Sequence, residues 1–174
     1  MEDNNLMGNL SGKNCLEKLA CLIPGYGGYV DKERRRDVDK LHREHLAQQL
    51  EKLKSPLTTL VRELSETGRL MEVKPVERVH GKLDKVANRI RYASYGYSGF
   101  FDTVKVQESE LDRLYQFDLG LTENVETITE NVSSLVENAN NNDMKTATSA
   151  LEHALDDLDA HFSERNKAIE NFIV

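Results

Sequence analysis

The sequence predicts an all-α protein, folded as an elongated antiparallel up-down four-helix bundle with coiled-coil-like heptad packing. Apolar residues recur at alternating spacings of three and four over four long segments, which places each set on one face of a helix. No segment alternates apolar and polar residues for long enough to predict a strand. With only 3 Pro and 6% aromatic residues in 174 positions, the composition also disfavours a β-sandwich or barrel.

The chain divides at about residue 30. Residues 1–30 are expected to form an N-terminal arm and a Gly/Tyr turn, and residues 31–174 the helical bundle. The arm holds one short apolar stretch, 15–23, which could cover an end of the bundle. Its two cysteines, Cys15 and Cys21, are too few for a disulfide framework and lack the second pair that a zinc site needs.

The first two helices are expected at about 31–67 and 75–95. Asp31 can cap the first of them. Pro56 falls within its apolar stripe without changing the register, which predicts either a kink or a new segment that starts there. Pro75 is expected to open the second helix. The stripes are Leu46, Leu50, Leu53, Leu57, Leu60 and Leu64 in the first helix and Val76, Val79, Leu83, Val86, Ile90 and Ala93 in the second.

The third and fourth helices are expected at about 104–139 and 143–172, with an Asn-rich turn between them and Asp143 as the cap of the fourth. Gly120 is the weak point of the third helix, because glycine costs about 1 kcal/mol relative to alanine inside a helix. The short turns predict that sequence neighbours run antiparallel. The stripes are Leu111, Leu114, Asp118, Leu121, Val125, Ile128, Val132, Leu135 and Ala139, then Leu151, Leu155, Leu158, Phe162, Ile169 and Phe172.

Asp118 is the single polar member of the third stripe. A buried ionised carboxylate without a partner is costly, so three interpretations are open: an ion pair with an arginine, exposure at a break near Gly120, or a functional role. Arg89 and Arg91 on the preceding helix are the candidate partners. Structural pairing is favoured, because buried polar residues commonly set the register of helical bundles.

Charge is unevenly spread along the chain. The net charge is −7, with +4 on residues 1–92 and −11 on residues 93–174. A basic half can bind nucleic acid or an anionic membrane surface. It can equally pack against the acidic half of the same molecule, which is the favoured interpretation. The polar, acidic start is unlike a secretory leader, and no apolar run reaches the roughly 18 residues of a membrane span. A cytoplasmic protein that binds no nucleic acid is therefore expected.

Metal-binding patterns are incomplete. A dimetal centre in a helical bundle takes a Glu-x-x-His pair from each of two helices and a Glu from each of two others. Glu77 and His80 provide that pair once, beside their stripe rather than in it, and Asp39 and His42 provide a shortened variant. No metal or other cofactor is expected. Because the chain also has no nucleophile or phosphate-loop motif, no enzymatic activity is expected.

Two Gly/Tyr-rich segments are the most distinctive feature. The first, IPGYGGYVDKERRRDVD, covers residues 23–39, and the second, RYASYGYSGFFD, covers residues 91–102. A glycine turn that leads into a helix start followed by arginines could hold a phosphate or a lipid headgroup, or could plug the bundle. An up-down order brings both segments to one end. The candidate docking patch there comprises Tyr26, Tyr29, Arg34, Arg35, Arg36, Tyr95, Tyr97, Phe100 and Phe101.

The two segments follow the patterns IPGYxGYxxKExRRxxD and RYxxYGYxGFFD. In these patterns the chain resembles a group of uncharacterised bacterial helical-bundle proteins. The resemblance is confined to the two segments. It carries no catalytic residue onto this chain and implies no activity.

The sequence therefore favours a non-enzymatic helical interaction or scaffold module. We expect a protein partner at the Gly/Tyr-rich end of the bundle, where the arginines are also compatible with an anionic membrane surface. The main alternative is a ferritin-like four-helix bundle that binds a metal or a small ligand. The heptad seams close either within one chain or between the two copies of a homodimer.

Overall fold

In the computed structural model the described residues are 12–93, 106–139 and 144–172, and every regular element among them is a helix. This confirms the all-α prediction. None of the described helices combines the length and the apolar character that crossing a membrane requires. The elements are α1 (Gly12–Leu22), the 3₁₀ turn η1 (Lys32–Arg34), α2 (Arg35–Lys52), α3 (Lys54–Glu66), α4 (Leu70–Tyr92), α6 (Glu108–Glu137) and α7 (Met144–Asn171).

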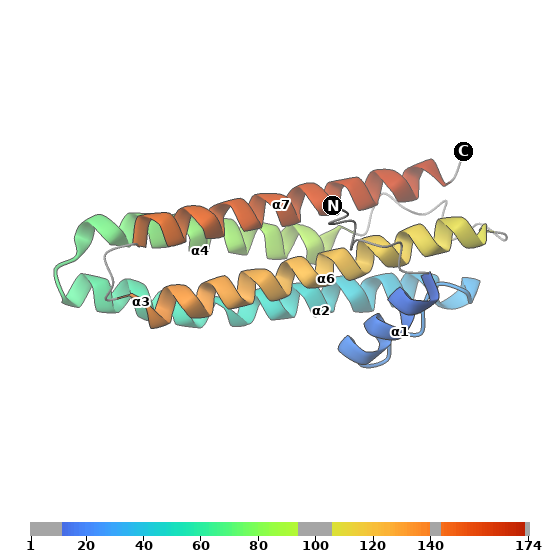
Figure 1. Cartoon of the computed structure of the whole chain (residues 1–174), viewed down its shortest axis with the longest axis horizontal. Helices are drawn as coiled ribbons and strands as arrows, with labels where there is room; N and C mark the ends of the chain where they lie inside the picture. The colour runs from blue at the N-terminus through green and yellow to red at the C-terminus, as the bar shows by residue number, and fades with distance from the viewer. Residues whose placement is uncertain (1–11, 94–105, 140–143, 173–174) are drawn as a thin grey trace, which may run out of the picture.

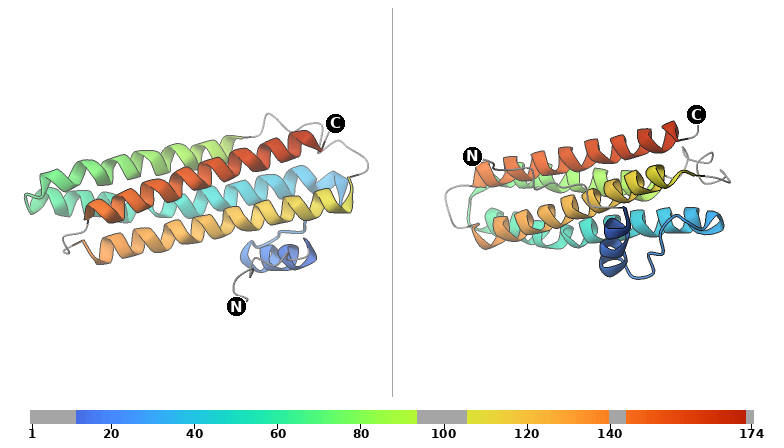
Figure 2. Two further views of the ribbon diagram at one scale, coloured as in Figure 1. Left: turned by 45° about the horizontal axis from the view of Figure 1, so that its top comes forward. Right: turned by 45° about the vertical axis from the view of Figure 1, so that its right-hand side comes forward.

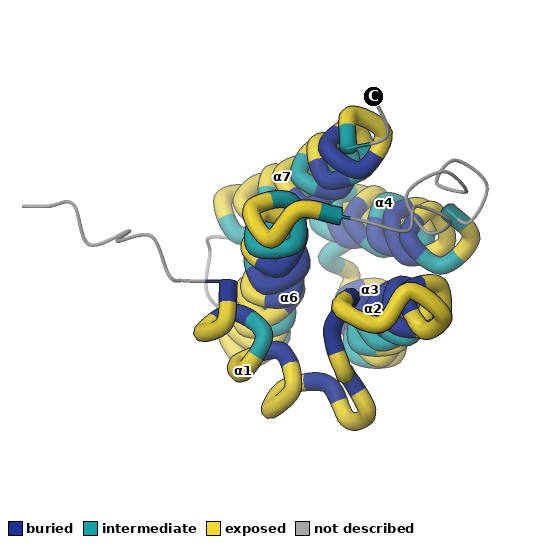
Figure 3. The backbone as a smooth tube through the Cα atoms, turned by 90° about the vertical axis from the view of Figure 1, so that its right-hand side faces the viewer, coloured by how far each residue is buried: buried dark blue, intermediate teal, exposed yellow. Residues whose placement is uncertain are grey.

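The long helices lie side by side in an elongated molecule (Figure 1). α2 and α3 follow one another along nearly one line, and α4 runs back beside them. α6 and α7 form the other half, with α7 packed against α4 (Figure 2). α1 lies outside these four rows of helix, against α6, close to the end where α2 begins (Figure 3). The arm thus covers a flank of α6 rather than an end of the molecule.

Two apolar clusters hold these helices together. The larger cluster runs through α2, α3, α4, α6 and α7 and contains the stripe residues given above for the first two expected helices, except Ala93, which is partly buried against it. The smaller cluster joins the arm to α2, α6 and α7, and comprises Cys15, Leu19, Ile23, Tyr26, Tyr29, Val38, Leu114, Tyr115, Leu119 and Ile169. Burial of these side chains provides the main favourable term for packing the helices and for docking the arm.

The first long helix is broken by its proline. Pro56 has no backbone N–H and its ring conflicts with the carbonyl of Lys52, four residues earlier. The helix therefore stops at Lys52, passes through Leu53, and restarts at Lys54 with Pro56 inside its first turn. The new segment thus begins two residues before the proline. Leu53 and Leu57 both stay buried, so the break does not disturb the apolar stripe.

The turn before α4 shifts the start of that helix from the expected position. Gly68 has φ +76°, and the N–H of Arg69 donates to the carbonyl of Leu64 (2.8 Å), which is the glycine-dependent way to end a helix. α4 then begins at Leu70, so Pro75 lies inside it instead of opening it. The carbonyl that Pro75 cannot bind belongs to Met71, a residue at the exposed start of the helix, where water can bind it.

Basic side chains of α4 pair with carboxylates of α7. Lys82 Nζ lies 2.5 Å from Asp156 Oδ2, and Arg78 Nε lies 3.2 Å from Glu152 Oε1. Arg89 pairs with Asp159 one helical turn further along. These contacts match part of the basic half of the chain to part of the acidic half. Each pair is partly exposed and contributes only about 0–1 kcal/mol, so the row favours the correct pairing of helices more than it adds stability.

The ends of the last two helices lie close to the expected limits. α6 begins at Glu108, where the Glu110 carboxylate accepts a hydrogen bond from the backbone N–H of Gln107 (2.8 Å). The Gln107 side chain accepts in return from the backbone N–H of Glu110. This reciprocal capping gives the helix a defined start. α7 begins at Met144, so its expected cap Asp143 lies outside the described residues, as does most of the Asn-rich turn before it.

Gly120 lies inside an uninterrupted α6, and its role is to make room for α7. A Cβ atom at this position would come within 2.5 Å of His161 Cε1. The ring of His161 is held there by a 2.8 Å contact between its Nδ1 and Asn124 Oδ1. The glycine therefore permits a close approach of the two helices instead of marking a break.

Gly120→Ala is expected to reveal this contact through its dependence on His161. In a His161→Ala background the alanine should stabilise the protein by about 1 kcal/mol, because only the helix preference remains. In the wild-type background the clash should cancel that gain. Urea unfolding of the four variants of the cycle measures both effects. Equal gains in the two backgrounds would contradict the proposed contact.

Candidate functional site

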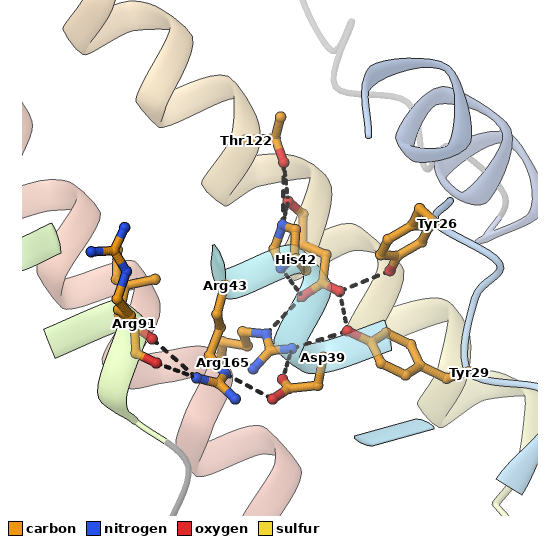
Figure 4. A network of polar contacts seen from close by, with 10 residues as sticks. Tyr26, Tyr29, Asp39, His42, Arg43, Arg91, Thr122 and Arg165 are labelled. Carbon is orange, nitrogen blue, oxygen red and sulfur yellow. Dashed lines mark hydrogen bonds and ion pairs between the residues drawn. The ribbon is translucent and has the colours of Figure 1, made fainter. Parts of the chain in front are cut away.

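The most unusual feature of the structure is a buried network of charged and polar side chains (Figure 4). It is centred on Asp118 of α6, whose side chain is fully buried. Asp118 Oδ1 accepts a hydrogen bond from Arg165 Nε of α7 at 2.6 Å. Its other oxygen, Oδ2, accepts from the hydroxyls of Tyr26 at 2.9 Å and Tyr29 at 2.6 Å. One carboxylate thus binds the Gly/Tyr turn and α7 to α6.

A second carboxylate extends the network to α2. Asp39 Oδ1 accepts from Arg165 Nη2 at 2.8 Å, and Asp39 Oδ2 accepts from Arg43 Nε, also at 2.8 Å. Arg43 Nη1 in turn donates to the backbone carbonyl of Arg91 at 2.7 Å, at the C-terminal end of α4. A guanidinium suits this position, because the last carbonyls of a helix have no partner within the helix and carry partial negative charge. The network therefore contacts all four rows of helix.

The Gly/Tyr turn is held by its backbone as well as by its rings. The N–H of Tyr29 donates to the hydroxyl of Tyr115 at 2.8 Å, and the carbonyl of Tyr29 accepts from Arg35 Nε at 2.8 Å. The rings of Tyr29 and Tyr115 stack with centroids 5.7 Å apart. Gly28, with φ +75°, is required here, since a Cβ atom would lie 2.7 Å from the Tyr115 hydroxyl.

Opposite charges are balanced inside the network. The carboxylates of Asp39 and Asp118 face the guanidinium groups of Arg43 and Arg165, and all four side chains are buried. Burial raises the pKa of Asp118, but the charge of Arg165 and the donated hydrogen bonds outweigh burial and hold that pKa below its ordinary value. Asp118 is therefore ionised at neutral pH, and the network holds one guanidinium for each carboxylate.

The two tyrosines keep their protons. Burial raises the pKa of the Tyr26 and Tyr29 phenols well above the ordinary value, and the charge of Asp118 raises both further. Both groups therefore act as hydrogen-bond donors to Asp118 over the physiological pH range. Burial lowers the pKa of Arg165, but the neighbouring carboxylates of Asp118 and Asp39 outweigh burial and hold that pKa well above its ordinary value.

His42 is the one group of the network described so far that can change its charge near neutral pH. Its Nε2 lies 3.3 Å from Thr122 Oγ1 and 3.2 Å from the carbonyl of Asp118. The Thr122 hydroxyl donates its proton to the same carbonyl (2.8 Å), so both of these oxygens accept from the N–H at Nε2 of His42. The other ring nitrogen, Nδ1, has no hydrogen-bond partner and lies 3.4 Å from Asp118 Oδ1. Burial lowers the pKa of His42, against the opposing effect of the Asp118 charge. His42 is therefore neutral at pH 7.

The depressed pKa of His42 predicts a loss of stability in mild acid. The unfolded chain takes up this proton near the ordinary pKa of about 6.5, whereas the folded chain takes it up only at lower pH. Stability is thus fully present above about pH 6.5 and decreases as the pH falls toward the folded pKa. Urea unfolding between pH 8 and pH 5 should show this slope, and His42→Gln should reduce it. The same slope in His42→Gln and in the exposed-site control His153→Gln would contradict the assignment.

The structure corrects the expected partners of Asp118. Neither Arg89 nor Arg91 reaches it. Arg89 pairs with Asp159 on the outer side of α4 and α7, and Arg91 Nη1 lies 2.5 Å from Glu51 Oε1 on the side of α2. Asp118 is paired with an arginine, as the favoured interpretation held, but the arginine is Arg165.

The expected docking patch is also revised. Tyr26, Tyr29 and Arg35 are buried in the network or against it, so they cannot form an exposed surface. Arg34 and Arg36 are exposed at the start of α2. The remaining members of the expected patch, Tyr95, Tyr97, Phe100 and Phe101, lie outside the described residues.

The glycine turn is not built to hold a phosphate. A cavity of about 170 Å³ lies beside it, lined by backbone of Gly25, Gly27 and Gly28 and by side chains that include Arg34. Two carboxylates, Asp31 and Asp37, also line it. One of them, Asp31, accepts a hydrogen bond from the N–H of Glu33 at 3.1 Å and so occupies the helix start. Negative charge outweighs positive charge where an anion would have to bind.

The metal-binding alternative finds no support in the side-chain positions. Within the described ranges, no group of three or more His, Cys, Asp or Glu side chains is arranged to hold a metal ion. Glu77 is exposed, and His80 Nε2 contacts Thr58 Oγ1 at 3.4 Å. Asp39 and His42 both lie in the network, where the guanidinium of Arg165 occupies the position next to the carboxylates.

The sequence contained a signal for this network that the search for apolar stripes missed. Continuing the first stripe backward from Leu46 by steps of four, three and four gives His42, Asp39 and Arg35. Arg165 falls in the fourth stripe, three residues after Phe162 and four before Ile169. All four polar residues are buried. Polar residues in core register on several helices therefore predict a buried polar layer, although not which residue pairs with which.

No protein-family model matches the chain, and comparison with curated proteins and with solved structures finds no significant similarity. Function is therefore inferred from the geometry.

Proposed function

We propose that this chain is a non-enzymatic helical interaction or scaffold module. The observation that carries the proposal is the use of its buried charged side chains. Asp39, Asp118 and Arg165 are each at most 3% exposed and bind one another, so they hold the molecule together and leave no carboxylate or guanidinium of this group open to a substrate. Ionic groups that are paired in this way typically define the register of a helical assembly.

The proposal includes the finer architecture expected from the sequence. The four rows of helix, α2 with α3, α4, α6 and α7, form an up-down bundle whose heptad seams close within one chain. The burial of the stripe residues supports this arrangement, since most of them lie in the larger cluster, and Leu114 and Ile169 lie in the smaller one. A rigid elongated bundle of this kind suits a scaffold, because its surface positions are fixed relative to one another over its whole length.

A protein partner is proposed at the end where α2 begins. Val30, which precedes the exposed Arg34 and Arg36 in the chain, is 70% exposed there. Tyr92, which is 68% exposed, lies further along the bundle, at the end of α4 where Arg43 of α2 binds the Arg91 carbonyl. Large apolar side chains next to arginines are typical of the centre of a protein interface. The acidic residues Asp31, Glu33 and Asp37 alternate with the basic ones, which favours a protein over an anionic membrane surface as the partner.

Photo-crosslinking tests this proposal. Benzoylphenylalanine placed at Val30 is expected to give one discrete adduct with a protein partner in cells, and the same group at Met71 should not. Met71 is a matched control, since it is 90% exposed but lies at the start of α4, at the other end of the molecule from the start of α2. Val30→Asp should then abolish binding of the identified, purified partner with no change in Tm. Adducts of equal yield at both positions, or none at Val30, would refute docking at this end.

A further inference from the structure

A groove follows α6 on the side of the arm. One cavity of about 400 Å³ lies between α2 and α6, with Leu46 and Val125 in its lining, and a second of about 560 Å³ lies between α1 and α6. Leu22 and Glu126 line both cavities, and Leu22 is 40% exposed. We refer to the two cavities and the residues they share as the α6 groove. Of its apolar lining residues, Leu22 and Cys21 are exposed, whereas Leu46 and Val125 are buried beneath it.

One wall of the α6 groove is acidic. Glu123, Glu126 and Glu130 of α6 line it, are exposed, and form no ion pair within the part of the chain that the structure describes. The opposite wall carries one lysine, Lys18, and one further carboxylate, Glu17, both in the lining of the second cavity. Burial and the neighbouring Lys52 lower the pKa of His45, which is therefore neutral at pH 7.

One row of carboxylates on α7 differs from these glutamates. On α7, Glu152, Asp156 and Asp159 are each matched by a cation of α4. On α6, the three glutamates form no ion pair among the described residues, and they lie beside the exposed Leu22.

We propose that the α6 groove binds a cationic amphipathic helix of a protein partner. The exposed Leu22 and Cys21 would contact the apolar face of that helix, and its lysines or arginines would lie against Glu123, Glu126 and Glu130. The three glutamates are spaced by three and four residues and span about 10 Å along α6, which matches basic residues one and two turns apart on a partner helix. A helix in a groove recognised by apolar anchors and flanking charges is a common mode of peptide binding. The site is separate from the docking end around Val30.

The test uses the purified full chain and a fluorescein-labelled amphipathic peptide of 18 residues composed of Leu and Lys. Fluorescence anisotropy at physiological salt measures the Kd. The double variant Glu126→Gln/Glu130→Gln is expected to weaken binding at least tenfold, and Leu22→Lys should do the same by removing an apolar anchor. The matched control is Asp157→Asn/Glu164→Gln, which removes the same charge from exposed positions of α7 and should change the Kd less than twofold.

Three results would overturn the proposal. Equal weakening by the groove variant and the control would show that only net charge attracts the peptide. No weakening by either groove variant would show that the peptide binds elsewhere. Displacement of the peptide by equimolar spermine would show that the groove binds small polyamines. Val30→Asp is expected to leave the Kd unchanged, so a failure here is distinguishable from a failure of the docking end.

Discussion

Asp118→Asn is expected to lower the free energy of unfolding by about 3–5 kcal/mol, the range for removing one partner of a buried ion pair. The substitution keeps the shape of the side chain but removes the charge that faces Arg165, which has no solvent to replace it. It also puts an amide N–H₂ group where the carboxylate now accepts from Tyr26 and Tyr29 or from Arg165. Urea unfolding at pH 7 measures the loss.

Asp159→Asn is the matched control for this prediction. Asp159 also pairs with an arginine between helices, but the pair is partly exposed, so its loss should cost only about 0–1 kcal/mol. The double variant Asp118→Asn/Arg165→Gln should lose less than the sum of the two single variants, because it leaves no buried charge without a partner. Additive losses would show that Asp118 and Arg165 contribute independently, contrary to the structure.

Tyr29→Ala is expected to destabilise the protein by about 3–5 kcal/mol, as for other large buried aromatic residues, and to release the arm. The ring stacks on Tyr115, and its hydroxyl donates to Asp118 at 2.6 Å. Without it, the turn that connects α1 to α2 loses its main contact with α6. Hydrogen exchange should therefore show a larger loss of protection in α1 than in α4.

Two variants separate the contributions of Tyr29. Tyr29→Phe keeps the ring but leaves Asp118 one donor short, so it should cost about 1–3 kcal/mol and leave α1 protected. Val30→Ala changes the next residue, which is exposed, and should alter stability by less than about 0.5 kcal/mol. Unchanged protection of α1 in Tyr29→Ala would show that the arm is held without the turn.

The network also explains part of the first Gly/Tyr pattern in physical terms. Tyr26 and Tyr29 of that pattern donate to Asp118, Arg35 binds the turn backbone, and Asp39 binds Arg165. Four positions of the motif thus serve to dock the arm and to join it to α7.

The sequence by itself determined the helices and most of the core. Stripes such as the one from Leu46 to Leu64 predict buried faces because the three- and four-residue spacing is a local property of the α-helix. The turn at Gly68 could be placed for the same reason, since a glycine that ends a helix acts through its own backbone. The start of α4 could not be placed from the sequence, because a helix accepts Pro75 in its interior only if the turn before the proline is exposed.

Only the tertiary structure decided which charges meet. The apolar stripe around Asp118 marks it as a core position, but arginines of two helices, α4 and α7, are candidates to pair with it. The pairing with Arg165 depends on which of these helices faces α6 at the level of Asp118. The docking of the arm on the flank of α6, and the space that Gly120 leaves for His161, likewise follow from contacts between segments far apart in sequence. Periodicity is set by neighbouring residues, whereas an ion pair across helices is set by their packing.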